Sequence, residues 1–169
     1  MDLFEAIHQR RTVKDYAPEP VPRETLERIL EAARWAPCHR MTEPWRFRVV
    51  GPVTLGRLVT VAGEGAAKLL RAPTLVVASY VPSALPLHAE EDHEAAACAV
   101  YAVLLAATAE GLASYWRTPG ILRGEAGRAA LQLPEGERTL GLLHFGWAAD
   151  AAPPPPVRRG VEDYVSYID

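Results

Sequence analysis

The stretch AEEDHEAAACAVYAVLLAATAEG, residues 89–111, decides how this chain folds. It predicts one long helix that ends at Gly111, with Glu90, Glu91 and Asp92 in a first turn where the helix dipole favours acids. Below those acids the helix is apolar nearly all round and built from small residues, which is typical of a helix buried on most sides. In a chain of 169 residues, we therefore expect a second subunit to cover part of it.

Apolar strands are predicted on both sides of this helix. APTLVVASYV, residues 72–81, is of the fully buried kind, and RTLGLLHFGWA, residues 138–148, reads as a central strand. PWRFRVV, residues 44–50, is a strand with alternating faces, and LASYWRTPG, residues 112–120, is a short strand that runs into a loop. Residues 82–88 are predicted to form a loop before the long helix.

Four shorter helices complete the pattern. The first, residues 2–9, has a capping pair in Asp2 and Glu5, and the second, residues 22–35, begins with a proline and stops before Pro37. The others are expected at residues 54–62 and 122–133. Because helices and strands are mixed without strict alternation, we predict a single α+β domain, residues 1–169, with a sheet covered by helices. The proline run near the end predicts an extended arm.

Composition and charge exclude several classes of protein. Hydrophobic residues make up 49%, the net charge is −3 and the pI is near 6.0, which argues against nucleic acid or an anionic membrane as a partner. Two cysteines, Cys38 and Cys98, are too few for a disulfide framework. The first residues lack the apolar run of a signal peptide, and the long helix is too short in its apolar part to span a membrane. We therefore expect a cytoplasmic location.

A basic cluster follows the first helix in HQRRTVKDY, residues 8–16. Arginine forks match phosphate oxygens, and a hydroxyl adds a donor, so Arg10, Arg11 and Thr12 suit a phosphate while Lys14 suits another part of the same ligand. The simpler interpretation is a solvated basic helix end, where the cations interact favourably with the helix dipole. When the cluster is read on its own, the solvated helix end is favoured.

Other candidate groups are weaker when each is read alone. Trp35, with Trp45, is expected in the core or in the wall of a flat pocket, while His39 and the thiol of Cys38 lie in a proline-broken loop. SYWRTPG, residues 114–120, combines an aromatic residue, an arginine and a hydroxyl at a strand end. Two further arginines, 158 and 159, follow the proline run and read as a charged tail.

A metal site is considered and set aside. His88 and Asp92 share one helix face and His93 is adjacent, but a metal needs three or four converging ligands, so a charged helix start is favoured. The sequence also lacks G-x-G-x-x-G after a strand, a P-loop, G-x-S-x-G and H-E-x-x-H. We therefore expect no metal and no Rossmann site for a nicotinamide nucleotide.

Taken together and in order, these stretches resemble the FMN-dependent nitroreductase family, in its branch of short NAD(P)H nitroreductases. RRTVKDY matches that family's first motif, APCHRMTEPWRF the segment that leads into the first strand, and GLASYWRTPG the loop after the long helix. The match covers nearly the whole chain, and the order and spacing of the motifs are more specific than any one of them. The resemblance implies a mixed, mainly antiparallel sheet flanked by helices. It also implies an intertwined homodimer with tightly bound FMN in two sites built from both chains.

The resemblance also supplies roles for individual residues. It implies that Arg10 and Thr12 hold the phosphate and ribityl side of FMN with Arg11 close by, and that Lys14 faces the N1 and C2 carbonyl edge of the ring. Lys14 would tune the flavin, and no catalytic acid, base or nucleophile is implied. Arg158 or Arg159 falls where many relatives place a tail arginine on the phosphate.

Further contacts are implied for the middle of the chain. Trp35 and His39 match positions that contact FMN from the partner subunit, and Trp116, Arg117 and Thr118 match the loop over the ring. The proline in WRTPG removes one N–H, so the donor to flavin N5 must come from Thr118 or Gly120. The stretch that relatives use for the nicotinamide nucleotide corresponds to Ala106, Ala107, Thr108, Ala109, Glu110 and Gly111.

The implied activity is hydride transfer from NAD(P)H, a transient co-substrate, to flavin N5 and then to a nitroaromatic, quinone or similar small-molecule acceptor by a ping-pong mechanism. The alternatives are a flavin reductase and a non-catalytic FMN-binding module of the same fold. Residues 51–72 are compact compared with relatives, so the pocket is expected to be open. The preferred nucleotide, the physiological acceptor and the role of Cys38 are left undecided by the sequence.

Overall fold

A four-stranded antiparallel sheet forms the centre of the molecule. The computed structural model describes residues 1–168 and places the strands in the order β1 (Trp45–Val49), β2 (Thr74–Tyr80), β4 (Arg138–Gly146) and β3 (Ala113–Arg117). Each neighbouring pair is antiparallel, with Val76 opposite Leu143 at the centre. The predicted α+β fold with an antiparallel sheet is confirmed.

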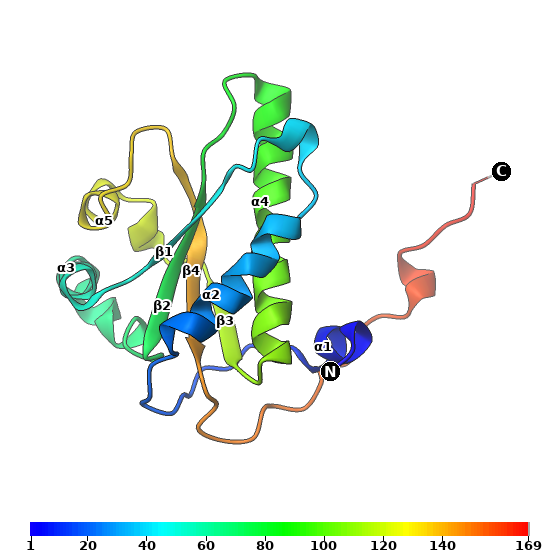
Figure 1. Ribbon diagram of the computed structural model, residues 1–169, viewed down its shortest axis with the longest axis horizontal. Coiled ribbons are helices and arrows are strands. Elements are labelled where there is room, and N and C mark those ends of the chain that lie inside the picture. The colour runs from blue at the N-terminus through cyan, green and yellow to red at the C-terminus, as the bar shows by residue number, and fades with distance from the viewer. Residues whose placement is uncertain (169) are drawn as a thin grey trace.

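Helices cover both faces of the sheet (Figure 1). One face carries α2 (Arg23–Glu31) and α4 (Pro86–Ala109), and the other carries α3 (Pro52–Ala62) and α5 (Glu125–Ala130). The remaining helix, α1 (Leu3–Gln9), packs against α4. Short 3₁₀ helices occupy Ala32–Trp35, His39–Met41, Gly63–Lys68, Gly120–Leu122 and Val161–Asp163.

The layering explains why β2 is apolar throughout. Successive side chains of a strand point to opposite faces, and both faces of this sheet are covered. Val76 lies in the core beneath α2 and α4, while Val77 lies in the core beneath α3 and α5, and both are fully buried.

The first helix begins as its sequence predicts. The Asp2 side chain accepts a hydrogen bond from the Glu5 backbone N–H at 2.8 Å, and Glu5 accepts from the Asp2 backbone N–H at 2.9 Å. This reciprocal pair satisfies two backbone donors that the first turn leaves free.

The long helix begins three residues earlier than predicted, at Pro86 rather than Ala89. Proline suits the first turn of a helix because its φ is already helical and no N–H is needed there. As a result, the predicted acids lie beyond the first turn, and Asp92 is buried with only 2% of its surface exposed. Its carboxylate is occupied by hydrogen bonds from two loops rather than by the helix end.

Three other expectations require correction. The predicted helix 22–35 is α-helical only to Glu31 and ends in a tighter turn, Ala32–Trp35. The predicted helix 122–133 is shorter, because Gly124 separates a single turn from α5. Trp35 is 79% exposed, so it is not a core residue in the protomer.

One side of α4 faces the core and the other is partly open. Ala99, Val100 and Val103 are fully buried, whereas Cys98 is exposed and Tyr101 is 42% exposed. The coverage of this open side by a second subunit stays a prediction.

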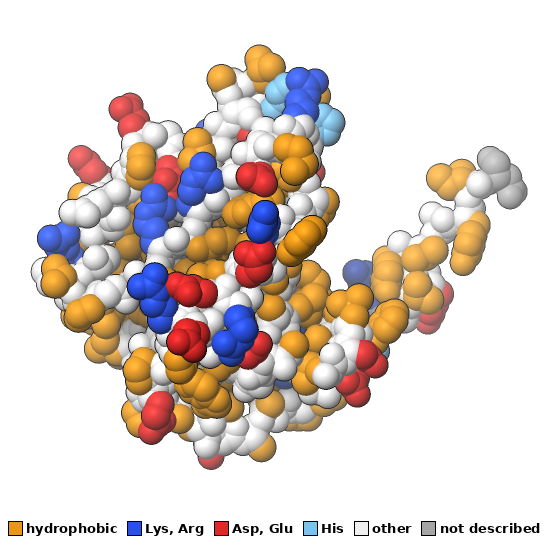
Figure 2. Space-filling model, in the orientation of Figure 1, with side chains coloured by type: hydrophobic (Ala, Val, Ile, Leu, Met, Phe, Trp, Pro, Cys, Tyr) orange, Lys and Arg blue, Asp and Glu red, His pale blue; other side chains and the backbone are white. Residues whose placement is uncertain are grey.

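The chain ends in an arm that leaves the body of the protein near α1 (Figure 1). Residues 151–168 are exposed apart from a half-buried Gly160, although several of their side chains are apolar. Figure 2 shows these apolar side chains along the arm. The predicted extended tail is confirmed up to Gly160, and a single helical turn follows it.

Candidate functional site

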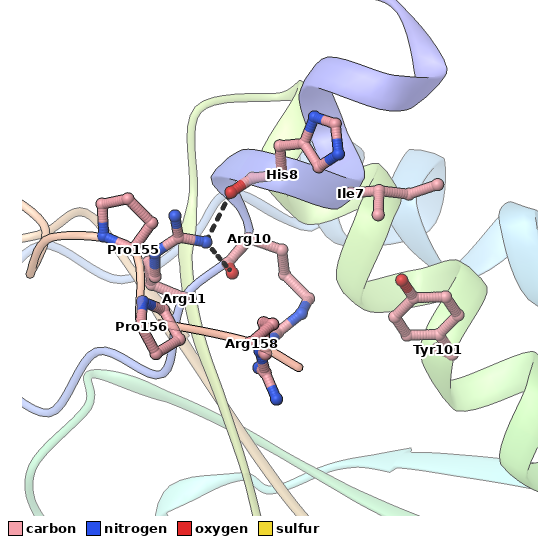
Figure 3. A pocket seen from close by; sticks show the side chains of 8 residues that line it. All are labelled: Ile7, His8, Arg10, Arg11, Tyr101, Pro155, Pro156 and Arg158. Carbon is pink, nitrogen blue, oxygen red and sulfur yellow. Dashed lines mark hydrogen bonds between the residues drawn. The ribbon is translucent and has the colours of Figure 1, made fainter. Parts of the chain in front are cut away.

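A cavity of about 670 Å³ lies where the end of α1 meets the arm (Figure 3). We call it the arginine cavity. It brings together three of the predicted site residues from opposite ends of the chain. Its lining consists of Ile7, His8, Arg10, Arg11, Tyr101, Pro155, Pro156 and Arg158.

Arg10 and Arg158 supply the charge that faces this cavity. Arg10 is the C-cap of α1, where its N–H donates to the Ala6 carbonyl at 2.9 Å, and Arg158 comes from the arm. Both side chains line the cavity (Figure 3). None of the described residues lining the cavity is a carboxylate, so the two cations have no acid partner there. Such a pair suits a phosphate, because guanidinium forks match its oxygens.

Arg11 has a different role from its neighbour. Its Nη1 donates to the carbonyls of His8, at 2.5 Å, and Arg10, at 2.9 Å (Figure 3). Its guanidinium therefore caps the carbonyl end of α1 and fixes the backbone of Arg10. Its buried Nε has no hydrogen-bond partner among residues 1–168.

Two smaller hollows, separate from the arginine cavity, lie along the same amino-terminal segment. The first, about 200 Å³, shares Arg11 and is lined also by Val13, Thr108 and Gly111. The second, about 350 Å³, shares Val13 and contains Lys14. All three hollows lie between residues 10–15 and residues 148–158, and together we call them the amino-terminal groove.

Lys14 differs from Arg10 in its surroundings. It is exposed, and the hollow that it lines with Thr12 also contains the carboxylates of Asp15 and Asp150. The structure therefore places Thr12 and Lys14 along the groove but outside the arginine cavity.

The groove is held to the edge of the sheet by backbone hydrogen bonds. Thr12 forms a bridge with Ser114 of β3, and the Val13 N–H donates to the Ser114 carbonyl at 3.1 Å. The Tyr16 hydroxyl donates to the Val13 carbonyl at 2.7 Å. Burial, with smaller contributions from Tyr115 and Asp15, raises the pKa of Tyr16, so this donor keeps its proton.

The predicted WRT residues separate at the end of β3. Trp116 packs against the core beneath α4, and its indole Nε1 donates to the Leu140 carbonyl at 3.3 Å. Arg117 is half-buried, and its Nη1 has no partner in the described chain. Thr118 is exposed. Neither Arg117 nor Trp116 lines any of the three hollows.

Arg117 instead contributes to the surroundings of a buried histidine, His144, that the sequence did not single out. The His144 ring stacks on Tyr115 with centroids 5.5 Å apart, and its Nε2 lies 3.2 Å from the Lys68 carbonyl oxygen. Burial, followed by the charges of Arg117 and Arg71, lowers the pKa of His144 to about 4. The imidazole is therefore neutral at pH 7.

The end of α4, predicted to meet the nicotinamide nucleotide, is only partly open. Thr108 and Gly111 line the middle hollow, but Ala107 is fully buried in the core. The carboxylate of Glu110 pairs with Arg28 at 2.9 Å. Ala106 is half-buried and Ala109 is exposed.

Trp35 and His39 lie away from the groove, beside the amino-terminal half of α4. His39 lines a separate hollow with Cys38, Glu91 and Cys98, and its Nδ1 is 3.9 Å from a Glu91 carboxylate oxygen. Within one protomer the structure does not bring these two residues to Arg10. Their predicted contact is with FMN of the partner subunit, and it stays a prediction.

Asp92 is the main residue near His39 that sequence reasoning misinterpreted. It accepts hydrogen bonds from Thr42 and Ser83 and does not join His88 and His93 as a metal ligand. Burial opposes its ionisation, but the hydrogen bonds from Ser83 and Thr42 and the charge of His88 leave its pKa below the usual value. No group of three or more His, Cys, Asp or Glu within residues 1–168 is arranged to hold a metal.

Two placements complete the site. Arg159 is exposed and lies outside the arginine cavity that its neighbour lines. Tyr101, which sequence reasoning missed, forms part of the cavity wall. In the sequence, the only feature that marked it was its being a lone tyrosine in an alanine-rich helix.

No helix in the described part of the chain combines the length and the apolar character that crossing a membrane requires.

Comparisons with known proteins agree with this fold. The Nitroreductase family model matches residues 7–76 and 62–147. The chain belongs to the nitroreductase family. A provisionally named NAD(P)H nitroreductase of Haemophilus influenzae is 29% identical over 99% of this chain and 100% of that protein.

Solved structures share the whole fold. A nitroreductase-like family protein from Bacillus cereus has a TM-score of 0.90 at 22% identity and covers 100% of this chain and 97% of its own. A protein from Desulfovibrio desulfuricans, described as a nitroreductase in complex with FMN, has a TM-score of 0.82 at 26% identity, covering 100% of this chain and 98% of its own.

Proposed function

We propose that this chain is an FMN-dependent oxidoreductase that passes hydride from NAD(P)H through the flavin to a nitroaromatic, quinone or similar acceptor with ping-pong kinetics. The observation that carries this proposal is that Arg10 and Arg158, from opposite ends of the chain, line one cavity in which none of the described residues is an acid. Membership of the nitroreductase family and the FMN complex of a structural relative support the cofactor.

Arg10 and Arg158 would hold the FMN phosphate. The phosphate would supply the negative charge that balances the two guanidinium groups, and each guanidinium can donate two hydrogen bonds to it. Arg11 would act indirectly, because its guanidinium already holds the backbone of Arg10. Arg159, exposed beside the cavity, is the alternative tail ligand.

The rest of the cofactor would extend along the amino-terminal groove. Thr12 would donate on the ribityl side, and Lys14 would face the N1 and C2 carbonyl edge of the ring. The loop of Trp116, Arg117 and Thr118 would contribute backbone N–H donors near N5, from Thr118 or Gly120 because Pro119 has none.

When bound, FMN would supply the two-electron chemistry that no side chain of this chain provides. The role of Lys14 would be electrostatic, since a cation near N1 stabilises the negative charge of the reduced ring. No acid, base or nucleophile of the protein is required in this proposal.

The second half of each site would come from a partner subunit. The open side of α4, the exposed Trp35 and the apolar arm all leave apolar surface that a monomer would expose to water. A homodimer would cover this surface and bring Trp35 and His39 of one chain to the flavin of the other. The nicotinamide nucleotide would approach near Thr108 and Gly111, which line the groove.

The decisive experiment is an anaerobic titration of the purified, FMN-loaded protein with NADH and NADPH. Bleaching of the flavin absorbance, followed by its return on adding nitroaromatic or quinone, is expected. Bleaching that is reversed only by free flavin would favour the flavin reductase. Flavin binding with no bleaching by either nucleotide would favour a non-catalytic FMN-binding module, and a colourless protein that FMN does not stabilise would reject the proposal.

A further inference from the structure

Asp92 is a buried carboxylate that the proposed chemistry does not use. One oxygen accepts a hydrogen bond from the Thr42 hydroxyl at 2.6 Å. The other accepts from the Ser83 backbone N–H at 2.7 Å and from the Ser83 hydroxyl at 2.5 Å. Asp92 thus fastens two separate loops to α4, one before β1 and one after β2.

The loop fastened through Thr42 has a conformation that needs support. Arg40, Met41 and Glu43 all have positive φ, at 54°, 52° and 43°. Residues other than glycine rarely adopt this backbone conformation, because their Cβ atom crowds the backbone there. Three such residues within four positions persist only if contacts outside the loop hold them in place.

Thr42 is the point at which these contacts meet. Its hydroxyl hydrogen is directed to Asp92, while its oxygen lies 3.3 Å from the Cys38 sulfur. That sulfur also accepts a hydrogen bond from the Glu43 backbone N–H at 3.0 Å. Cys38, Thr42 and Asp92 therefore form a continuous connection from the start of the loop to the core of the protein.

His39 is carried by this loop, and its side chain is 55% exposed. Its ring lies 3.9 Å from a Glu91 carboxylate oxygen, and its centroid is 6.3 Å from that of His88. No side-chain hydrogen bond fixes the imidazole within residues 1–168, so the loop backbone determines where the ring is presented.

We propose that Asp92 is a positioning residue which, through Thr42, holds loop 38–43 so that His39 meets the flavin bound by the partner subunit. This inference rests on the proposed function, which places His39 at that flavin. Asp92 would touch neither cofactor nor substrate. Its contribution would be to remove the cost of ordering the loop when the cofactor binds.

A double-mutant cycle for FMN affinity tests the connection. Thr42→Val removes the donor to Asp92 with little change in shape and is expected to weaken FMN binding about tenfold, the effect of one charge-assisted hydrogen bond. In a His39→Ala background the same change should have almost no further effect, because the two residues act as one unit. Additive effects of the two substitutions would overturn the proposal.

Two controls bracket this result. Thr42→Ser keeps the hydroxyl and should restore wild-type affinity. Thr60→Val is the matched control, because Thr60 is exposed on α3 and bonds only to the Gly56 carbonyl of its own helix, at 3.1 Å. It should leave FMN affinity unchanged, and a loss equal to that of Thr42→Val would show a general effect on stability and overturn the proposal.

Hydrogen exchange in the FMN-free protein distinguishes the positioning role of Asp92 from the proposed FMN-dependent function. Thr42→Val should accelerate exchange within residues 38–43 and leave β2 and β4 protected. Unchanged exchange in that loop would overturn the positioning role whatever the flavin result. Faster exchange, together with a wild-type protein that binds no FMN, would support the role of the Thr42–Asp92 hydrogen bond in holding the loop and would reject the proposed function instead.

Discussion

Arginine occurs in two contrasting environments in this molecule. Arg48 on β1 is matched by Glu137, with Nη2 2.8 Å from a carboxylate oxygen, and that carboxylate is 3% exposed and also accepts from Ser79. Arg10 and Arg158 face a cavity in which no described lining residue is an acid. The contrast suggests a criterion for the proposed phosphate site: what distinguishes it is the missing acid partner rather than the number of arginines.

The largest expected effect concerns the ion pair between Arg48 and Glu137. Glu137→Gln leaves Arg48 half-buried without its counter-charge and should lower the free energy of unfolding by about 3–5 kcal/mol, as for other broken buried pairs. Urea denaturation measures the change, and Glu135→Gln, on the exposed neighbour, is the control. FMN affinity of the folded protein should not change, and a stability within error of wild type would remove the contrast.

The next effect concerns the arginine cavity, whose two cations lack an acid among the described lining residues. Arg10→Ala combined with Arg158→Ala should weaken FMN binding about 100-fold, since each substitution removes at least one charge-assisted hydrogen bond. The melting temperature without FMN should not fall, because the two cations have no partner to lose. Fluorescence titration gives the affinity, and Arg159→Ala is the matched control. If Arg159→Ala alone has the full effect, the tail ligand is misassigned.

A comparable effect concerns His144, which is buried beside cations and stays neutral. Because its pKa is about 4 in the fold and near 6.5 when unfolded, the unfolded chain binds more protons in between. Stability is therefore present above pH 6.5 and declines toward pH 4, by about 3 kcal/mol. His144→Gln should flatten this decline in denaturation measured at pH 7 and 4.5, whereas exposed His8→Gln should leave it intact.

The smallest effect sharpens the comparison with an intermediate case, because Lys14 shares its hollow with Asp15 and Asp150. Lys14→Ala should lower the two-electron potential of bound FMN by about 30 mV, equivalent to about 1.4 kcal/mol. Redox titration against a reference dye measures it, with Lys68→Ala as the control. An unchanged potential would contradict the proposed tuning role.

Much of the fold could be predicted because its signals are local. The pairing of Asp2 with Glu5 began α1 as expected, and the apolar runs of β2 and β4 marked strands covered on both faces. The start of α4 was missed because its N-cap, Leu85, makes no side-chain bond and the acids that suggested a first turn lie further along.

The site was less accessible because its geometry is not local. The sequence named Arg10 and Arg158 and offered a helix-end role for the basic cluster, but it did not show that Arg11 in particular would cap α1. It also could not show that Asp92 is paired with Thr42, 50 positions away. These roles depend on how distant segments pack, which no pattern along the chain records.

The four consecutive prolines at 153–156 have a consequence for the length of the arm. Each proline restricts its own φ, and such a run advances about 3.1 Å and turns about 120° per residue. The run therefore sets the distance and the direction only over residues 153–156, from which the chain continues through Val157 to Arg158. Deleting one proline would both shorten the reach and rotate the guanidinium away, whereas deleting three would restore its direction at a shorter distance.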